Sequence, residues 1–417
     1  MSQTRTAVAI VGGGAIGLSC AFALADAGNE VVLFDPAPGR GASSGNAAGI
    51  TPGWVAPLAN MATLRAVPSM LRDSLSPLAI RPAYLPRLLP WLLRFALAAR
   101  PARAEAVSRA LAALTLTAYE DWTEFAERAG VATLLRRQGL LYAYASKTRR
   151  DEAESGHAFR RAHGVRLEEF DAAALHRFAP MLASDYCHAV YAPDAGHFID
   201  PGALCEGLAA AFVARGGRIV EEDVDDIRIL HDGFDVKTKT HMWRAARIVL
   251  CAGAYSRPLA RKLGADVPLD VERGYHAMLA DPDIELPAQM IDGEGKYALT
   301  SMRGGLRVAG TVEFAGLDAA PDWRRAERLV SHAKRLLPGL RVRDPTFWMG
   351  FRPSLPDGLP VIGAAPADKR AILAFGHAHL GITLAAITAS LVVDLVAGKT
   401  PRIDLTPYAA ERFRSWF

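Results

Sequence analysis

The stretch VAIVGGGAIGLSCAFALADAGNEVVLFDP, residues 8–36, decides the fold class of this chain. Val8 to Val11 are apolar without alternation, as in a short buried parallel strand. Three glycines follow, and then an apolar helical pattern from Ile16 to Ala27, which Gly28 ends. Glu30 to Phe34 form a second apolar run. This order predicts the first strand–helix–strand unit of a Rossmann-like α/β domain.

The glycine spacing indicates a bound dinucleotide. Gly12, Gly14 and Gly17 form G-x-G-x-x-G, which allows a tight turn, close approach to a pyrophosphate and close helix–strand packing. Free N–H groups at the helix N-terminus favour the pyrophosphate charge. Asp35, 18 residues beyond Gly17, stands near the spacing at which a carboxylate accepts a hydrogen bond from a ribose hydroxyl. The motif alone does not choose between NAD and FAD.

The composition excludes several classes of protein. The 417 residues are 51% hydrophobic, which is enough for a large core or two domains. A formal charge of only +4 argues against nucleic acid as the main partner. The four cysteines (Cys20, Cys187, Cys205 and Cys251) are scattered, so we expect no metal site and no disulfide framework. We also expect no signal peptide, no transmembrane helix and a cytoplasmic protein.

Two further segments favour a long cofactor. Residues 39–53, GRGASSGNAAGITPG, are small, polar and turn-rich; they either run alongside an extended cofactor or form a flexible surface loop. Near the other end, we expect a strand from Ile372 to Phe375, a glycine-rich turn and a helix from about Gly381 to Val396. That helix N-terminus favours negative charge. A cofactor that touches both residue 12 and residue 381 should be long, which favours FAD.

Several stretches together resemble the FAD-dependent D-amino acid oxidase superfamily, which includes glycine and sarcosine oxidases. They are the N-terminal fingerprint, SSGNAAGITPGWVAP, RIVLCAGAYS, GYHAMLA, FWMGFRPSLPDGLPVIG and GHAHLGITLA, so the resemblance spans nearly the whole chain. The last two stretches are far more specific than the fingerprint. Within the superfamily, the chain is most similar to the small subunit of bacterial D-amino acid dehydrogenase and to relatives acting on D-hydroxyproline. Ala378 departs from the glycine of many relatives.

The resemblance implies a division into two domains. A Rossmann-like FAD-binding domain would comprise the discontinuous segments 1–60, 187–268 and 345–417. A substrate-binding domain with a mainly antiparallel sheet and helices would comprise 61–186 and 269–344. On the residues themselves, Val107 to Gly130 and Ala319 to Leu337 are predicted helical, and KYALTSMRGGLRVAGTVEF alternates as antiparallel strands do.

Arg352 is the first candidate for chemistry. It lies in WMGFRPSLPDG, where the matching arginine of the family binds the substrate carboxylate. A planar guanidinium holds a carboxylate in a bidentate fork and so fixes Cα over the flavin. The alternative is an arginine paired with a structural acid such as Asp357.

The resemblance implies further site residues, each with a plainer alternative. Tyr275 faces the substrate or is a cross-strand aromatic. His276 is a second candidate for substrate contact or, because adjacent strand residues face opposite sides, points away from it. Arg303 is a second contact to substrate or a solvated strand residue. His379 is the histidine of GHAHLG expected over the flavin and is counted with Arg352 and Tyr275 as catalytic. Trp54 covers the active site or packs in the core.

The residues expected at the cofactor come from six parts of the chain. Val224 is either where the backbone meets the adenine or ordinary strand core. The full set is Gly12, Gly14, Ala15, Ile16, Gly17, Asp35, Pro36, Arg40, Ser43, Ser44, Asn46, Ala47, Gly49, Ile50, Val224, Ala252, Gly253, Gly350, Arg352, Gly376, His379, Leu380, Gly381, Ile382 and Thr383. No cysteine stands in MGFRPSLPD, so we expect FAD to be non-covalent.

The expected reaction is oxidative deamination of a D-amino acid to the 2-oxo acid, by hydride transfer from Cα to flavin N5. The flavin performs the difficult step, so we look for no strong general base. Electrons would pass to a respiratory quinone or another acceptor besides oxygen. Two alternatives stay open: a D-proline or cis-4-hydroxy-D-proline dehydrogenase forming a cyclic imine, and a catalytic subunit of a heteromeric amine dehydrogenase.

A basic, apolar segment raises the question of membrane contact. Residues 65–103 hold seven arginines and one acid, Asp73. Within them Leu85, Leu88, Leu89, Leu92, Ala96 and Leu97 follow helical spacing, with Trp91 off that face. The segment either packs inward in the substrate domain or binds anionic lipid at the inner membrane as an interfacial helix.

Overall fold

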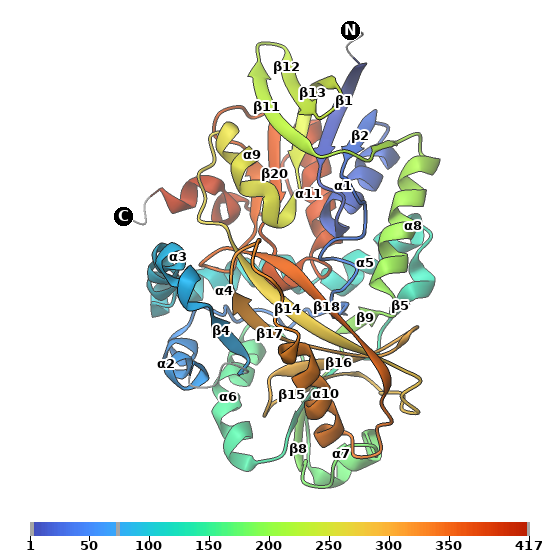
Figure 1. Cartoon of the computed structure of the whole chain (residues 1–417), viewed down its shortest axis with the longest axis vertical. Helices are drawn as coiled ribbons and strands as arrows, with labels where there is room; N and C mark the ends of the chain where they lie inside the picture. The colour runs from blue at the N-terminus through green and yellow to red at the C-terminus, as the bar shows by residue number, and fades with distance from the viewer. Residues whose placement is uncertain (1–3, 72–75, 415–417) are drawn as a thin grey trace.

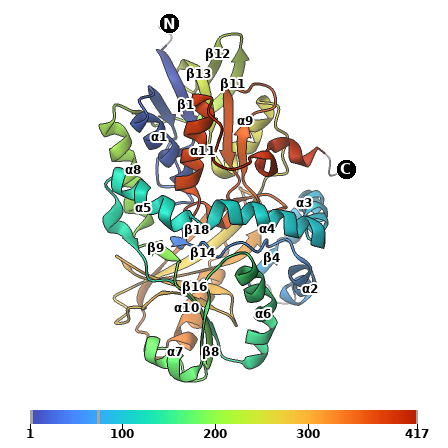
Figure 2. The ribbon, with the colours of Figure 1, turned by 180° about the vertical axis from the view of Figure 1, so that it is seen from behind.

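Two large sheets, one toward each end of the long axis of the molecule, form its framework (Figure 1). The computed structural model describes residues 4–71 and 76–414. The first and the last described segments, β1 (Thr4–Val11) and the turn Ala410–Phe413, belong to the upper part of the molecule, and helices cross the middle between the two sheets (Figure 2). The mixed α/β class expected from the sequence is confirmed.

The upper, eight-stranded sheet begins with the predicted strand–helix–strand unit. Its strands are β1 (Thr4–Val11), β2 (Val31–Phe34), β10 (Arg218–Val220), β11 (Val224–Leu230), β12 (Gly233–Thr238), β13 (Met242–Leu250), β19 (Val361–Ala364) and β20 (Ala371–Phe375). Strands β10, β2, β1, β13 and β20 run parallel in that order. The carboxyl ends of these strands therefore meet at one edge, where ligands of open α/β sheets bind.

The helices of the whole molecule have the following bounds. They are α1 (Ala15–Asp26), α2 (Met61–Met70), α3 (Leu85–Ala98), α4 (Pro101–Thr115), α5 (Ala118–Arg128), α6 (Lys147–Ala162), α7 (Ala172–Phe178), α8 (Pro201–Ala214), α9 (Ser256–Lys262), α10 (Arg324–Leu336) and α11 (Ala385–Ala397), with short 3-10 turns η1 (Pro82–Tyr84), η3 (Gly253–Tyr255) and η4 (Ala378–Leu380). Val8 and Ile10 of β1 share a core with α1, α8 and α11. Ala9 and Val11 face the opposite core, with β12 and α9, because successive strand residues alternate.

The lower, nine-stranded sheet is mainly antiparallel. Its strands are β4 (Leu78–Ile80), β6 (Leu140–Tyr144), β7 (Glu168–Phe170), β8 (His188–Ala192), β14 (Asp270–Ala280), β15 (Gln289–Asp292), β16 (Tyr297–Met302), β17 (Gly305–Phe314) and β18 (Arg343–Ser354). The predicted antiparallel pair is β16 with β17. A small third sheet of β3 (Gly49–Ile50), β5 (Leu135–Arg136) and β9 (Gly196–Phe198) lies at the junction.

The long strand β14 separates two environments. Tyr275, Ala277 and Leu279 share a core with α10, which covers the outer face of the sheet. Glu272 and His276 therefore lie on the inner face, which is directed at the upper unit. Since β14 pairs with both β17 and β18, residues of all three strands meet on that inner face.

Sheet membership moves the expected domain boundaries. β8 and β18 both belong to the lower sheet, so the boundaries expected at 187 and 345 fall beside or within its strands. Helices α4 and α5, expected in the substrate domain, pack with α1 and α11 of the upper unit. We propose an upper unit of about 4–60, 101–130, 200–268 and 355–414, with the remainder below.

Three helical predictions need correction. α11 begins at Ala385 and not at Gly381. The N–H of Ala385 donates to the carbonyl of Ile382 in a tight turn, and the indole N–H of Trp122 donates to the same carbonyl. α10 begins at Arg324 and not at residue 319. In α3, Trp91 is buried, where it packs on Phe314 and donates to the carbonyl of Ser354.

The bond from Trp122 Nε1 to Ile382 O, 2.7 Å long, supports the turn before α11. We expect Trp122→Phe to lower the free energy of unfolding by about 1–3 kcal/mol, because a buried carbonyl loses a partner. Trp323→Phe is the matched control, since Trp323 is 43% exposed, and should change it by less than about 0.5 kcal/mol. Chemical denaturation measures both. Equal losses in the two variants would contradict the proposed role of the bond.

Candidate active site

The turn after β1 is built so that only glycine fits at two positions. Gly12 has φ +104°, and a Cβ there would lie 2.5 Å from the carbonyl oxygen of Cys251. A Cβ on Gly17 would overlap the carbonyl oxygen of Gly12. The start of α1 is thereby pressed against the ends of β1 and β13. This is the close helix–strand packing that the G-x-G-x-x-G spacing predicts.

The middle glycine of the motif has a different environment. A Cβ on Gly14 would meet only the hydroxyl of Ser43, at 3.2 Å, so the backbone is open to a ligand on this side. That hydroxyl accepts a hydrogen bond from the N–H of Ala15. Asp35, at the end of β2, accepts from the N–H of Gly13 at 2.6 Å and from that of Ala37 at 2.8 Å. The sequence-predicted phosphate turn and ribose acid are therefore brought together.

These features fit a dinucleotide with an adenosine end. An open glycine backbone at a helix N-terminus suits a pyrophosphate, and the carboxylate beside it suits a ribose hydroxyl. Val224 begins β11 four residues after Val220, whose carbonyl accepts from the N–H of Asp35. Ala252, two residues after the end of β13, borders Gly12, and Gly253 follows it at the start of η3. Pro36 and Arg40 are exposed beside this turn.

The loop after Ser43 is held by the lower sheet through its main-chain carbonyls. His276 Nδ1 bonds Gly45 O at 2.9 Å, and Gln289 and Thr300 both donate to Ala47 O at 3.1 Å. Arg307 donates to the carbonyls of Ser44 and Asn46. All four side chains lie on the inner face of the lower sheet. The loop is therefore not a free surface segment, which was the alternative to its cofactor role.

Burial sets the protonation of two of these anchors. Burial lowers the pKa of His276 to about 4, so the ring is neutral at pH 7 and its Nδ1–H donates to the carbonyl. Burial also lowers the pKa of Arg307, to about 10, which leaves its guanidinium charged. Neither residue was expected to hold this loop: His276 was considered for substrate, and Arg307 was overlooked. Arg307 binds main-chain carbonyls, which every residue has, so no sequence pattern indicates this contact.

Arg352 lies on the same inner face, opposite Glu272 in the β14–β18 pairing. Its Nη1 donates to Thr311 O at 2.9 Å. A Cβ on Gly274 would strike the guanidinium, so that glycine gives the arginine its space. Asp357, the alternative partner, is instead bound by Arg412 at 2.8 Å. Arg352 is therefore positioned within the junction of the two units and not engaged by that acid.

A carboxylate and an imidazole complete this cluster. Glu272 is 6% exposed, and its Oε2 lies 2.9 Å from His379 Nε2 on η4. Trp54 stacks on the His379 ring, with centroids 6.0 Å apart. Burial raises the pKa of Glu272, but the bond from His379 and the charge of Arg352 outweigh burial and hold it below its ordinary value. Sequence reasoning missed Glu272, although it stands in the strand around Tyr275.

Two expected substrate residues lie elsewhere. Tyr275 points to the outer face of β14, where its hydroxyl donates to Glu313 at 2.6 Å. Because neighbours on a strand face opposite ways, the inward position of His276 takes Tyr275 away from Arg352. Arg303 lies in the turn between β16 and β17, exposed and 3.8 Å from Asp200. The structure does not bring either one to the Arg352 cluster.

The C-terminal turn joins the loop from the other side. Thr383 Oγ1 donates to Gly49 O at 3.0 Å, and Gly376 takes φ +82° directly after β20. Ile50 and Leu380 are buried nearby in the same unit, and Gly381 lies in the turn that leads into α11. Gly350, on β18, leaves space for the Trp348 ring, which stacks on His276. The two sequence stretches expected to share a long cofactor are thus adjacent.

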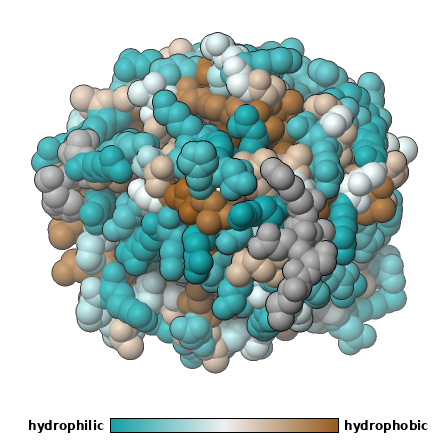
Figure 3. All heavy atoms as spheres, turned by 90° about the horizontal axis from the view of Figure 1, so that it is seen from above, coloured by the Kyte–Doolittle hydropathy of each residue, from teal (hydrophilic) through white to brown (hydrophobic). Residues whose placement is uncertain are grey.

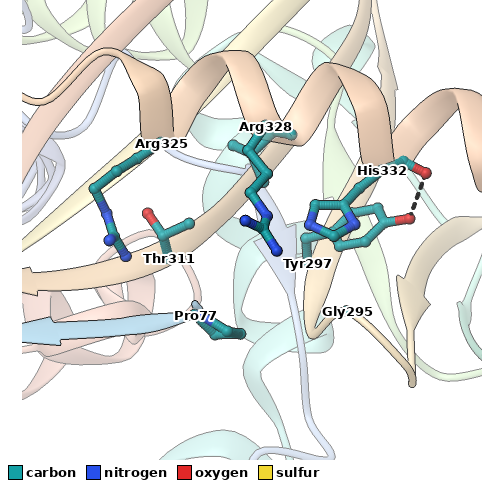
Figure 4. A pocket seen from close by; sticks show the side chains of 8 residues that line it. Pro77, Gly295, Tyr297, Thr311, Arg325, Arg328 and His332 are labelled. Atoms are coloured by element: carbon teal, nitrogen blue, oxygen red, sulfur yellow. Dashed lines mark hydrogen bonds between the residues drawn. The ribbon is translucent and has the colours of Figure 1, made fainter. Parts of the chain in front are cut away.

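A separate hollow lies beneath α10, on the outer side of the lower sheet (Figure 4). Arg325, Arg328 and His332 line it from successive turns of that helix, and Thr311 and Tyr297 line it from the strands. The Tyr297 hydroxyl donates to the carbonyl of His332 at 2.8 Å. Thr311 belongs to both places, since its carbonyl binds Arg352. The hollow contains none of the sequence-predicted site residues.

Comparison with known proteins agrees with this arrangement. The family model described as "FAD dependent oxidoreductase" matches residues 7–395. A D-amino-acid oxidase of Bradyrhizobium diazoefficiens is 38% identical, over 97% of this chain and 98% of its own length. A D-amino acid dehydrogenase of Paramagnetospirillum magneticum is 32% identical, over 98% and 99%. The crystal structure of glycine oxidase from Geobacillus kaustophilus superposes with TM-score 0.75 at 25% identity, covering 98% and 99%.

The contact of Gly17 with Gly12 predicts the effect of a single methyl group. Gly17→Ala should weaken FAD binding by about 1–3 kcal/mol, roughly 5- to 150-fold in affinity. Flavin content of the purified protein and FAD titration of the stripped protein measure this. Gly339→Ala is the matched control, since a Cβ there meets nothing within 4 Å. Full flavin content in Gly17→Ala would refute the packing argument.

Proposed function

Because this chain belongs to the family of FAD-dependent oxidoreductases, we propose that it oxidises a D-amino acid to the corresponding 2-oxo acid. Full-length relatives named D-amino-acid oxidase and D-amino acid dehydrogenase support this substrate class. The single observation that carries the proposal is Arg352, which stands on the inner face of the lower sheet beside Glu272 and His379. A guanidinium at the junction of two units suits the α-carboxylate of an amino acid.

The protein's own contribution is positioning. Arg352 would hold the α-carboxylate in a bidentate fork, and its bond to Thr311 O fixes the guanidinium plane. Trp54 and His379 form a stacked wall beside it. Bound FAD, which we expect to be non-covalent, supplies the acceptor for the hydride that leaves Cα. Fixing the carboxylate at one end leaves Cα and its hydrogen a limited range of positions.

We further propose an acceptor other than oxygen, reached at a membrane surface. Leu85, Leu89 and Leu93 of α3 are 44%, 51% and 52% exposed and lie one turn apart. Arg87 and Arg100 are exposed on or beside the same helix. By contrast, the end of the molecule above the upper sheet is mostly hydrophilic, with separate apolar patches (Figure 3). Exposed leucines flanked by arginines suit an anionic lipid surface.

The buried side of α3 and the preceding turn η1 bond the strands that carry Arg352 and Glu272. Trp91 donates to Ser354 O on β18, two residues from Arg352, and Tyr84 of η1 donates to Asp270 on β14. Residues 72–75, including Asp73, lie outside the described part of the chain. No helix among the described residues is long and apolar enough to cross a membrane.

The substrate class is tested by mixing the flavin-loaded protein, without oxygen, with D- and L-amino acids, D-proline and cis-4-hydroxy-D-proline. We expect bleaching of the flavin by D-forms only. Arg352→Lys should lower kcat/KM by about 10- to 100-fold, since a bidentate charged contact becomes a single one. Arg341→Lys, at an exposed arginine paired with Asp283, should be unchanged.

Other results of the same experiment decide between the alternatives. Faster bleaching by D-proline or its hydroxylated form would identify a cyclic amine as the substrate. No bleaching by any amino acid would refute the proposal and turn attention to a subunit that needs a partner. Mixing the reduced protein with oxygen or with a soluble quinone then identifies the acceptor; fast reoxidation by oxygen would overturn the acceptor proposed here.

Membrane contact is tested by sedimentation with anionic and neutral liposomes at low salt. We expect binding to anionic vesicles, and a fall of at least about tenfold when Leu85, Leu89 and Leu93 are all changed to serine. Val213→Ser is the control, since Val213 is 52% exposed on α8 and should leave binding intact. Equal binding of the triple variant, or no binding by the wild type, would refute the proposal.

A further inference from the structure

Glu272 and His379 form a hydrogen-bonded pair beside Arg352. Glu272 Oε2 and His379 Nε2 are 2.9 Å apart. The Glu272 side chain is 7% exposed, whereas that of His379 is 22% exposed. The carboxylate thus lies behind the ring, and the ring lies nearer the open side of the junction. Buried acids arranged in this way orient an imidazole for proton transfer.

The hydrogen bond also selects the tautomer. An ionised carboxylate only accepts hydrogen bonds, so the Nε2 of His379 must carry the proton that it donates to Glu272. The neutral ring then has its lone pair on Nδ1. Such a ring accepts a proton at Nδ1, and the carboxylate stabilises the imidazolium that forms.

The surroundings are balanced in charge. Arg352 faces Glu272 from β18, and Asp270 lies two residues from Glu272 on β14, where Tyr84 donates to it. Burial, the larger effect, raises the pKa of Asp270, although the positive charge of Arg257 favours its ionised form and so lowers it. The positive charge of Arg352 and the negative charge of the substrate carboxylate would cancel. The negative charge of Glu272 would likewise offset the positive charge of a protonated His379. A positive charge on the ring is therefore acceptable in this site, although the site is partly buried.

Oxidation of an amino acid by hydride loss requires that its ammonium group first lose a proton. At neutral pH the substrate is a zwitterion, R–CH(NH₃⁺)–COO⁻, whose nitrogen has no lone pair to donate as the Cα–H bond breaks. Loss of one proton gives the neutral amine. Hydride departure from Cα then gives the iminium R–C(=NH₂⁺)–COO⁻, and water converts it to the 2-oxo acid and ammonia.

We propose that His379, positioned by Glu272, accepts the proton of the substrate ammonium group at Nδ1 before the hydride leaves. The inference rests on the proposed oxidation of an amino acid and assigns the acid–base step of that reaction. The N–H bond of the ammonium breaks, its electron pair stays on the substrate nitrogen, and the proton moves to the ring. Glu272 acts through the ring as a positioning residue.

The test is the pH dependence of flavin reduction by a D-amino acid without oxygen. His379→Gln should slow reduction about 100-fold at neutral pH. The rate should recover toward that of the wild type at strongly alkaline pH, where solvent removes the substrate's proton. Glu272→Gln should show a smaller loss with the same recovery. The matched controls are His241→Gln and Glu222→Gln, an exposed pair of the same chemistry 3.9 Å apart, which should leave the profile unchanged.

The outcomes separate the two proposals. If the wild type is not reduced by any amino acid, the proposed function is wrong and this inference falls with it. If the wild type is reduced but His379→Gln is slowed equally at every pH, or not slowed, only the inference is overturned. Flavin content and thermal melting of each variant show whether it is folded.

A measurement on the wild type keeps the test independent of the variants. Conversion of the ammonium to the iminium releases one proton overall. With a pH-indicator dye in weak buffer, we expect that proton to reach solvent after the flavin has bleached, since His379 retains it first. Appearance of the proton before bleaching would overturn the proposal.

Discussion

The structure depends on one set of hydrogen bonds, those between the inner face of the lower sheet and the carbonyls of residues 44–47. His276, Gln289, Thr300 and Arg307 come from four different strands and converge on four consecutive peptides. The same loop begins at the hydroxyl that caps Ala15 and ends near the turn before α11. One loop thus aligns the phosphate turn, the C-terminal turn and the sheet that carries Arg352.

The parts of the fold that sequence reasoning predicted are those governed by local rules. The unit from β1 to β2 follows from apolar runs and glycine spacing, and the structure shows why: Gly12 and Gly17 leave no room for a side chain. Boundaries were less accurate where a tertiary contact intervenes. The start of α11 depends on Trp122, which is more than 250 residues away and carries no signal at that distance.

The site was predicted in part for the same reason. Arg352 could be proposed as a site residue because it lies in a specific motif, whereas Glu272 enters the candidate site only because strand pairing places it opposite Arg352 and η4 brings His379 to it. The choice between Tyr275 and His276 required knowledge of which face of β14 looks inward. Alternation along a strand shows that adjacent side chains point to opposite faces of the sheet. Only the packing of α10 on the outer face shows that Tyr275 points outward and His276 inward.

The loop anchors also bear on how such a protein can change. Every bond from the lower sheet to residues 44–47 ends on a main-chain oxygen, which any amino acid possesses. Side chains of the loop can therefore be exchanged to suit the cofactor without disturbing the attachment, except at Gly45, where a Cβ would lie 2.2 Å from the Trp348 ring. Strands of the lower sheet can be altered for a new substrate as long as the four donors are kept. Cofactor fit and substrate preference are, to that extent, independently variable traits.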